Sequence, residues 1–172
     1  MLIRTADDQG LSQVVALMPL YMSETYGAEW HGSEDAIRAA VAAEKLQVLT
    51  ASRAERIAGF IAWTPAYDLH WCISGGAVAD LYVRRGARGR AVALRLLAAA
   101  AASISRDGGA FLRGTAVDRG AGRKLYGRVA VCSSTTECTV GGRAFRQLAE
   151  LENAPARELV ERLPVVPLNY EP

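Results

Sequence analysis

The sequence predicts a single α/β domain over residues 1–172. Short runs rich in β-branched and aliphatic residues alternate with longer segments in which apolar residues recur every three or four positions. With 172 residues, 51% of them hydrophobic, the chain is large enough to bury one substantial core. No repeat, low-complexity linker or shift in composition marks a boundary. We therefore expect one domain with the order β-α-α-β-β-β-α-β-α-β and a helical C-terminus.

The N-terminal half is predicted to contain four strands and two helices. Asp7 or Asp8 caps the first helix, Pro19 kinks it or ends its regular part, and Ser33 caps the second helix. The expected elements are a strand at 3–5, a helix from about 8 with an irregular extension at 21–26, a helix from 34, strands at 46–51 and 57–63, a loop around 67–76, and a strand at 78–83.

The C-terminal half is predicted to contain further alternating elements. A helix from about Arg90 ends at the Asp107-Gly108-Gly109 signal. The remaining expected elements are a strand at 111–117, a helix from 118 to 130, one Ser/Thr-rich strand at 131–140, helices at 145–151 and 156–163, and a tail at 164–172.

Charge and cysteine content limit the class of protein. The net charge is only +2, but residues 84–128 carry eleven basic against two acidic residues, whereas residues 1–83 carry five against ten. This asymmetry favours an anionic ligand for the middle of the chain, although ordinary solvated faces also produce charge runs. Three cysteines without a Cys-x-x-Cys pair predict free thiols and no metal site, and no signal peptide or membrane span is evident. We therefore expect a cytoplasmic protein.

The stretch "ADLYVRRGARGRAVALRLL", residues 79–97, joins an apolar strand to a helix through a loop rich in Gly and Arg. The first N–H groups of a helix lack internal partners, and its dipole favours negative charge there. Glycines let the backbone approach an anion closely, and flanking guanidinium groups add positive charge. The pattern therefore predicts a pyrophosphate cradle. Neither a Gly-x-Gly-x-x-Gly nor a Gly-Lys-Ser/Thr loop is present, which argues against dinucleotide and P-loop sites.

This stretch resembles the GNAT N-acetyltransferase superfamily, whose signature is a strand ending in a Leu-x-Val pattern followed by R/Q-x-x-G-x-G/A. The resemblance implies a mixed, mostly antiparallel sheet flanked by helices, with the fourth and fifth strands splayed to hold acetyl-coenzyme A (acetyl-CoA). The cofactor-binding residues that it implies are Leu81, Tyr82 and Val83 at the strand end, and Arg88, Gly89, Arg90, Ala91, Val92 and Ala93 in the loop and helix start. Ala91 replaces the central glycine, and we expect it to sit in a helix start with negative φ.

A second likeness to the family follows the strand at 111–117. The Leu125-Tyr126 pair is kept, whereas Arg119 or Asp118 stands where members commonly carry Asn. By this resemblance Tyr126 is the general acid that protonates the leaving thiolate, and a packed aromatic is the alternative. A third, softer likeness lies at 139–145.

The general base is less clearly marked. Asp80 is a carboxylate in an otherwise apolar strand, where a charge is costly unless it is paired or functional. Strand alternation places Val78, Asp80 and Tyr82 on one face and Leu81 and Val83 on the other. Asp80 is therefore a candidate base beside the reacting centre, and an ion pair with an arginine is the equally weighted alternative.

The segment "YMSETYGAEW" matches the family's variable acceptor wall. Tyr21, Glu24, Tyr26 and Trp30 are the candidate substrate-binding residues, because aromatic rings with carboxylates suit an organic cation. Core packing of the rings is the alternative. Glu24 and Glu29 also remain alternatives for the base.

Taken with the resemblance, these features predict an N-acetyltransferase that transfers acetyl from acetyl-CoA to a small primary amine by direct attack. A protein or aminoacyl-tRNA acceptor and a non-enzymatic acyl-CoA sensor are the alternatives. Nucleic acid is disfavoured because the Arg/Gly loop lacks interleaved aromatic residues. No membrane partner is expected, and the strand at 131–140 is a candidate edge for a homodimer.

Overall fold

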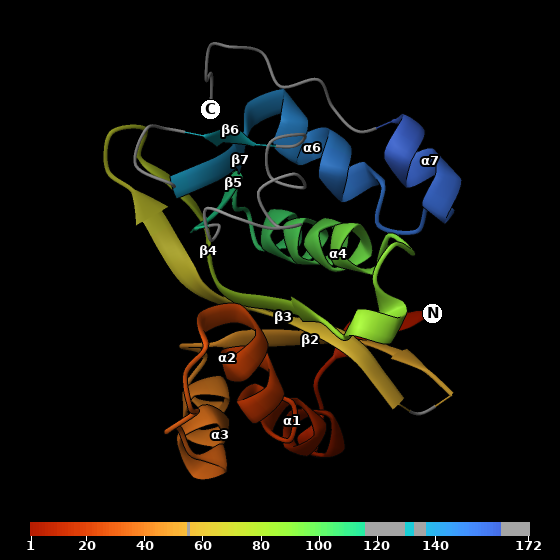
Figure 1. Ribbon diagram of the computed structural model, residues 1–172. Coiled ribbons are helices and arrows are strands. Elements are labelled where there is room, and N and C mark those ends of the chain that lie inside the picture. The colour runs from red at the N-terminus through yellow and green to blue at the C-terminus, as the bar shows by residue number, and fades with distance from the viewer. Residues whose placement is uncertain (55, 116–129, 133–136, 163–172) are drawn as a thin grey trace.

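The computed structural model describes residues 1–54, 56–115, 130–132 and 137–162 (Figure 1). Within these residues one sheet has the strand order β1-β2-β3-β4-β5-β7-β6. Its strands are β1 (Leu2–Thr5), β2 (Gln47–Arg53), β3 (Arg56–Asp68), β4 (Ile73–Val83), β5 (Phe111–Thr115), β6 (Val131–Cys132) and β7 (Glu137–Gly141). All pairings are antiparallel except β4 with β5, which is parallel. The predicted mixed, mostly antiparallel sheet is confirmed.

Helices cover both faces of the sheet. Figure 1 shows α1 (Asp8–Val15), α2 (Met18–Tyr26) and α3 (Glu34–Ala42) on one face, and α4 (Val92–Arg106), α6 (Gly142–Glu150) and α7 (Ala156–Glu161) on the other. Two hydrophobic clusters follow this division. One joins α1 and α2 to the sheet around Phe60 and Tyr82, and the other surrounds α4. The sheet therefore separates two sides on which different groups can be presented.

The larger core depends on the small side chains of α4. Every residue from Ala98 to Ala102 is buried, and α4 packs against α6, whose Phe145 and Leu148 are also buried. Alanine side chains allow helices to approach closely while still excluding water. A rigid α4 results, and its N-terminus lies next to the end of β4.

The helix caps are as expected. The Asp7 carboxylate accepts a hydrogen bond from the Gly10 N–H at 2.8 Å, and the Ser33 hydroxyl accepts one from the Ala36 N–H at 3.1 Å. Pro19 behaves differently from the prediction, because it occupies the first turn of a separate helix, α2. Proline is tolerated there because the first N–H groups of a helix have no internal partner. Residues 21–26 are therefore regular helix.

Two predicted segments differ from the structure. Residues 67–76 are mostly strand rather than loop, because β3 and β4 form a long hairpin with its tip at 69–72. The predicted single strand at 131–140 is two strands, β6 and β7, which pair antiparallel. The predicted helix from 118 lies outside the described residues. The N-terminal helices, β1, β2, the end of α4 and the two C-terminal helices are confirmed.

Candidate active site

The described pairing of the two central strands ends just before the predicted site. β4 and β5 pair only from Gly75 with Phe111 to Val78 with Gly114. β4 continues to Val83 and stays paired with β3 along that length. Within the described residues, positions 79–83 therefore have a partner strand on one side only. Among the described residues no strand pairs with β4 on this side beyond Val78, as the predicted splay requires, and the backbone groups there are candidates for pairing with an extended ligand.

A β-bulge sets which side chains of β4 face which helices. Asp80 pairs with Ala62 but Val78 pairs with the next residue, Trp63, so Ala79 is an extra residue in β4. The predicted alternation of side chains between the two faces is therefore wrong for Val78, which comes before the bulge. Val78 packs in the α4 cluster with Leu81 and Val83, whereas Tyr82 packs with α1 and α2.

Backbone groups of the strand end follow the same alternation. The Arg84 N–H donates to the Ala58 carbonyl on β3 at 2.9 Å. Because successive residues of a strand point their N–H groups to opposite sides, those of Val83 and Leu81 point away from β3. They point to the side on which no described strand pairs with β4 beyond Val78, where they can pair with a ligand or stabilise a developing oxyanion.

The Arg/Gly loop leads into α4 through a left-handed turn. After a short 3₁₀ turn at Arg85–Ala87, Gly89 has φ +75° and Ala91 has φ +57°. The expectation of a negative φ at Ala91 is therefore wrong: this residue precedes the helix as its N-cap and does not belong to it. The first intrahelical bond runs from the Arg95 N–H to the Ala91 carbonyl, so the three N–H groups before Arg95 are free of helical partners.

No side chain of the described structure fills this helix start. Ala91 makes no side-chain cap, and the first turn of α4 carries no acidic residue. The exposed Arg84 and Arg90 lie in the same loop. Free N–H groups, the positive end of a helix dipole and cationic side chains together fit an anionic phosphate.

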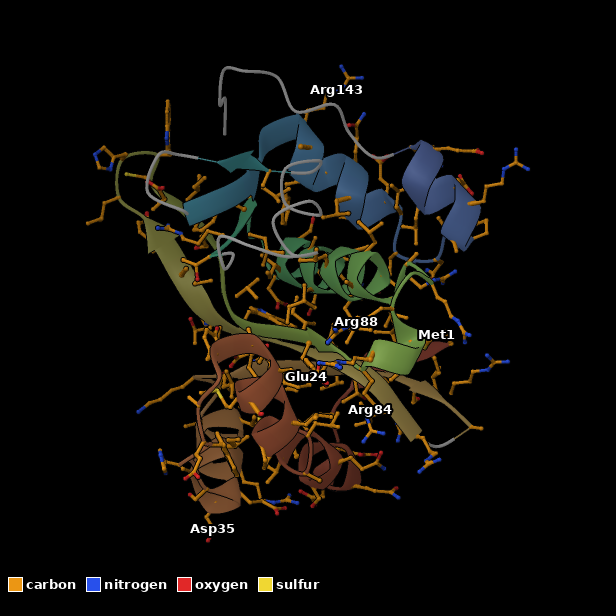
Figure 2. The ribbon with its side chains drawn as sticks, viewed as in Figure 1. Met1, Glu24, Asp35, Arg84, Arg88 and Arg143 are labelled. Carbon is orange, nitrogen blue, oxygen red and sulfur yellow. The ribbon has the colours of Figure 1, made fainter. Side chains whose placement is uncertain are left out.

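The motif arginine makes specific contacts of its own. Arg88 donates from Nε to the Val83 carbonyl at 2.8 Å and from Nη2 to Glu24 at 2.6 Å. Its guanidinium also lies 5.8 Å from the centre of the Tyr82 ring. Figure 2 shows Glu24 and Arg88 together where α2 meets the loop. Arg85 forms a second ion pair with Glu24, at 3.1 Å.

Tyrosine side chains line the β4 side of α2. The Tyr21 hydroxyl lies 3.2 Å from that of Tyr26, and Tyr21 is only 4% exposed whereas Tyr26 is 54% exposed. Burial raises the pKa of Tyr21, and the neighbouring Tyr26 hydroxyl and Asp80 carboxylate raise it further. Tyr21 therefore stays neutral and presents its hydroxyl to the candidate base.

Tyr82 is the second buried tyrosine of this cluster. Its ring centre lies 5.4 Å from that of Tyr21. Burial raises the pKa of Tyr82, as does the nearby charge of Glu24, while Arg88 acts in the opposite direction. No hydrogen bond of normal geometry reaches its hydroxyl within the described structure. The carboxylate of Glu24 is thus close to a phenol that stays protonated.

The structure brings most of the predicted residues together. Asp80, Tyr21, Glu24 and Tyr26 gather between α2 and the end of β4, and the loop residues adjoin them. Trp30 is partly buried against the α1–α2 cluster. Tyr126 lies outside the described residues.

Sequence reasoning missed two features of the site. The ion pair of Glu24 with Arg85 was not foreseen, nor was the bulge at Ala79. The signal for the first was present: a carboxylate on a mostly apolar helix and an arginine cluster are complementary. No helix of the described residues is long and apolar enough to span a membrane, and no cluster of metal-ligating side chains occurs among them.

Comparisons with known proteins agree with this geometry. A family model described as "Acetyltransferase (GNAT) family" matches residues 14–131. No curated protein sequence matches. A solved structure of a probable acetyltransferase is 22% identical, with a TM-score of 0.68 over 78% of this chain and 92% of that one. Ribosomal-protein-alanine N-acetyltransferase from Brucella melitensis biovar Abortus 2308 is 18% identical, with a TM-score of 0.64 over 78% and 94%.

A third similar structure holds a ligand. An aminoglycoside 6′-N-acetyltransferase complexed with coenzyme A is 20% identical, with a TM-score of 0.55 over 66% of this chain and 61% of that one. At these identities the likeness of the solved structures shows the fold, whereas the family model covers more than half of the chain. The chain therefore belongs to the GNAT acetyltransferase family and is an acetyl-CoA-dependent acyltransferase.

Proposed function

We propose that this protein transfers the acetyl group of acetyl-CoA to the primary amine of a small molecule. The observation that carries the proposal is the side of β4 at 79–83 on which no described strand pairs, which runs directly into a cationic helix start with N–H groups that lack helical partners. An extended pantetheine arm and a pyrophosphate need these two features in this order. Coenzyme A bound to a structure of similar fold supports the same choice of ligand.

Each group of the site has a proposed task. Acetyl-CoA supplies a thioester carbonyl that an amine can attack. The loop N–H groups, from Gly89 to Ala93, hold its phosphates. The backbone N–H groups of Leu81 and Val83 pair with the pantetheine arm and stabilise negative charge on the carbonyl oxygen.

Two side chains are proposed to move protons. Asp80 accepts the proton released by the attacking nitrogen as the N–C bond forms, and the Tyr21 hydroxyl beside it steadies the carboxylate. Tyr126 donates a proton to the sulfur as the C–S bond breaks. Tyr126→Phe should therefore lower kcat by roughly 10²–10⁴, the range of a positioned general acid, with cofactor affinity spared. Near-normal turnover with chemistry rate-limiting would exclude Tyr126 as the acid.

The acceptor is proposed to lie beside α2. Tyr26 and Trp30 offer aromatic surface, and Asp80 offers a negative charge for an amine. Glu24 is less available for this task than the sequence predicted, because both of its oxygens are paired with arginines. A small amine is also consistent with the acidic character of residues 1–83, which include α2 and carry ten acidic against five basic residues, so this part of the chain is a poor match for RNA.

A thiol-release screen of a mixed amine panel with acetyl-CoA tests the proposal. Small amines, an N-terminal peptide of a ribosomal protein and a lysine-containing peptide form the panel. Acetylation of small amines alone is the expected result. Acetylation confined to peptides would redirect the proposal to a protein acceptor. Binding of acetyl-CoA without any turnover would favour a sensor.

A further inference from the structure

The Glu24 carboxylate faces the cofactor loop. It lies on α2, and each oxygen pairs with a different arginine: Oε1 with Arg85 and Oε2 with Arg88. The Glu24 side chain is only 13% exposed, whereas Arg85 and Arg88 are 76% and 46% exposed, so the carboxylate is the more buried partner in both contacts. Figure 2 shows this contact far from Asp35, another carboxylate of the same helical layer.

Arg88 is held from three directions. The carbonyl of Val83 ends β4, the Tyr82 ring lies beneath the guanidinium, and Glu24 binds its outer edge. The planar fork of arginine can make the first and last of these bonds at once, which the single ammonium of lysine does less well. Arg88 thus bridges the end of β4 and helix α2, and its contacts fix the loop between them.

The loop needs such a restraint. Gly86 and Gly89 have wide conformational freedom, and Ala91 adopts a left-handed conformation that an alanine enters only at a cost. The free N–H groups bind phosphate well only if they are aligned before the ligand arrives. Without a restraint, ordering the loop would weaken cofactor binding.

We propose that Glu24 is a positioning residue for the cofactor. With Arg88 it holds the loop in the shape that presents the N–H groups at the start of α4 to the phosphates, without itself touching the cofactor. The motif arginine then serves the cofactor chiefly through the shape of the loop. This inference rests on the proposed function, because it concerns the same phosphate site.

The negative charge of Glu24, taken alone, predicts that this residue weakens the binding of the cofactor. Removing a negative charge beside a polyanion would strengthen its binding. If Glu24 acts by position, Glu24→Gln should instead weaken coenzyme A binding, about tenfold for the loss of a charge-assisted bond. Asp35→Asn is the matched control, since it removes the same charge from an exposed site on α3. The affinity of this variant for coenzyme A should equal that of the wild type.

The experiment is isothermal titration of coenzyme A into the wild type, Glu24→Gln, Asp35→Asn, Arg88→Lys and the Glu24→Gln/Arg88→Lys double variant. Arg88→Lys keeps the positive charge but not the bridge, so it should also weaken binding. The double variant should bind about as weakly as either single variant, because both changes break the same contact between Glu24 and Arg88.

A second readout separates position from general damage. The KM for S-acetylpantetheine, which lacks phosphates, should be unchanged in Glu24→Gln, whereas the KM for acetyl-CoA rises. Equal increases for both donors would mean a general defect and overturn the inference. If Glu24→Gln does not fold, Arg88→Lys decides by the same two measurements.

The remaining outcomes are also distinct. A wild type that does not bind coenzyme A overturns the proposed function and this inference with it. A wild type that binds, with Glu24→Gln binding equally or more tightly, overturns the inference alone.

Discussion

Ala91 shows how much one backbone angle changes the interpretation of a motif residue. Its φ of +57° is a conformation that glycine adopts freely, whereas an L-residue pays about 1–2 kcal/mol to enter it. Glycine also lowers the free energy of unfolding by about 0.5–1 kcal/mol, because it gives the unfolded chain more conformational freedom. Ala91→Gly should therefore raise the free energy of unfolding by about 0.5–1 kcal/mol, with coenzyme A affinity equal or slightly higher.

The control for Ala91→Gly is two residues further along. Ala93 lies inside α4, where glycine only weakens a helix, so Ala93→Gly should lower the free energy of unfolding by about 0.5–1 kcal/mol. Urea denaturation of both variants measures the two effects. A loss of stability in Ala91→Gly would mean that this residue does not hold the left-handed turn.

Tyr21 links burial at a single residue to alkaline stability. Its pKa is raised in the folded protein, chiefly by burial, from an ordinary value of 10.0. The native state therefore keeps the proton to higher pH than the unfolded chain. The contribution of Tyr21 to the free energy of unfolding is complete below pH 10.0. It is lost as the pH rises further, by at most about 1.4 kcal/mol per pH unit.

We expect the wild type to lose stability above pH 10.0 more steeply than Tyr21→Phe, which has no hydroxyl to ionise there. Urea midpoints at a series of alkaline pH values give the comparison. Tyr67→Phe, which removes an exposed hydroxyl from β3, should follow the wild type. Identical slopes for the wild type and Tyr21→Phe would contradict the burial of the Tyr21 hydroxyl.

At the scale of elements, the end of β4 is held close to β3 by a glycine. A Cβ at Gly59 would lie 2.5 Å from the Tyr82 carbonyl oxygen and 3.2 Å from the Val83 Cα, both of them backbone atoms. Gly59→Ala must therefore push the two strands apart. We expect a loss of about 1–3 kcal/mol of unfolding free energy and weaker coenzyme A binding, since the displaced Val83 is one of the two residues proposed to pair with pantetheine.

Gly86→Ala is the comparison for Gly59→Ala. A Cβ there meets no atom within 4 Å, so both stability and binding should stay close to those of the wild type. Thermal unfolding and calorimetric titration measure the pair. If Gly59→Ala loses stability but binds coenzyme A normally, the strand end does not contact the cofactor.

The same elements show what the sequence could predict. Local signals placed the caps at Asp7 and Ser33 and the loop that opens α4, because each depends on neighbouring residues alone. The bulge at Ala79 leaves no such trace, since an extra residue in an apolar strand changes no local pattern. The pairing of Glu24 with Arg88 joins residues 64 positions apart, so charge complementarity in the sequence could suggest it but only the fold identifies the two partners.

At the scale of the whole molecule, opposite charges are concentrated in different parts of the chain. The N-terminal half is acidic, whereas the loop after β4 carries exposed arginines such as Arg84 and Arg90. On the proposed function, a polyanionic cofactor is attracted to the arginine-rich loop and a cationic amine to the acidic part of the chain. The two substrates would then reach the end of β4 from different directions.

This charge division predicts how the kinetics depend on salt. Raising NaCl from about 20 to 200 mM shortens the screening length severalfold, so exposed charges attract over a shorter range. The KM for acetyl-CoA should therefore rise several-fold, with kcat nearly constant, because salt weakens the long-range attraction of the cofactor and leaves the proposed short-range proton transfers unchanged. S-acetylpantetheine, which has no phosphates, should show a KM that does not change with salt. A salt-independent KM for acetyl-CoA would mean that the exposed arginines do not attract the cofactor, and would leave its binding to the backbone N–H groups at the start of α4.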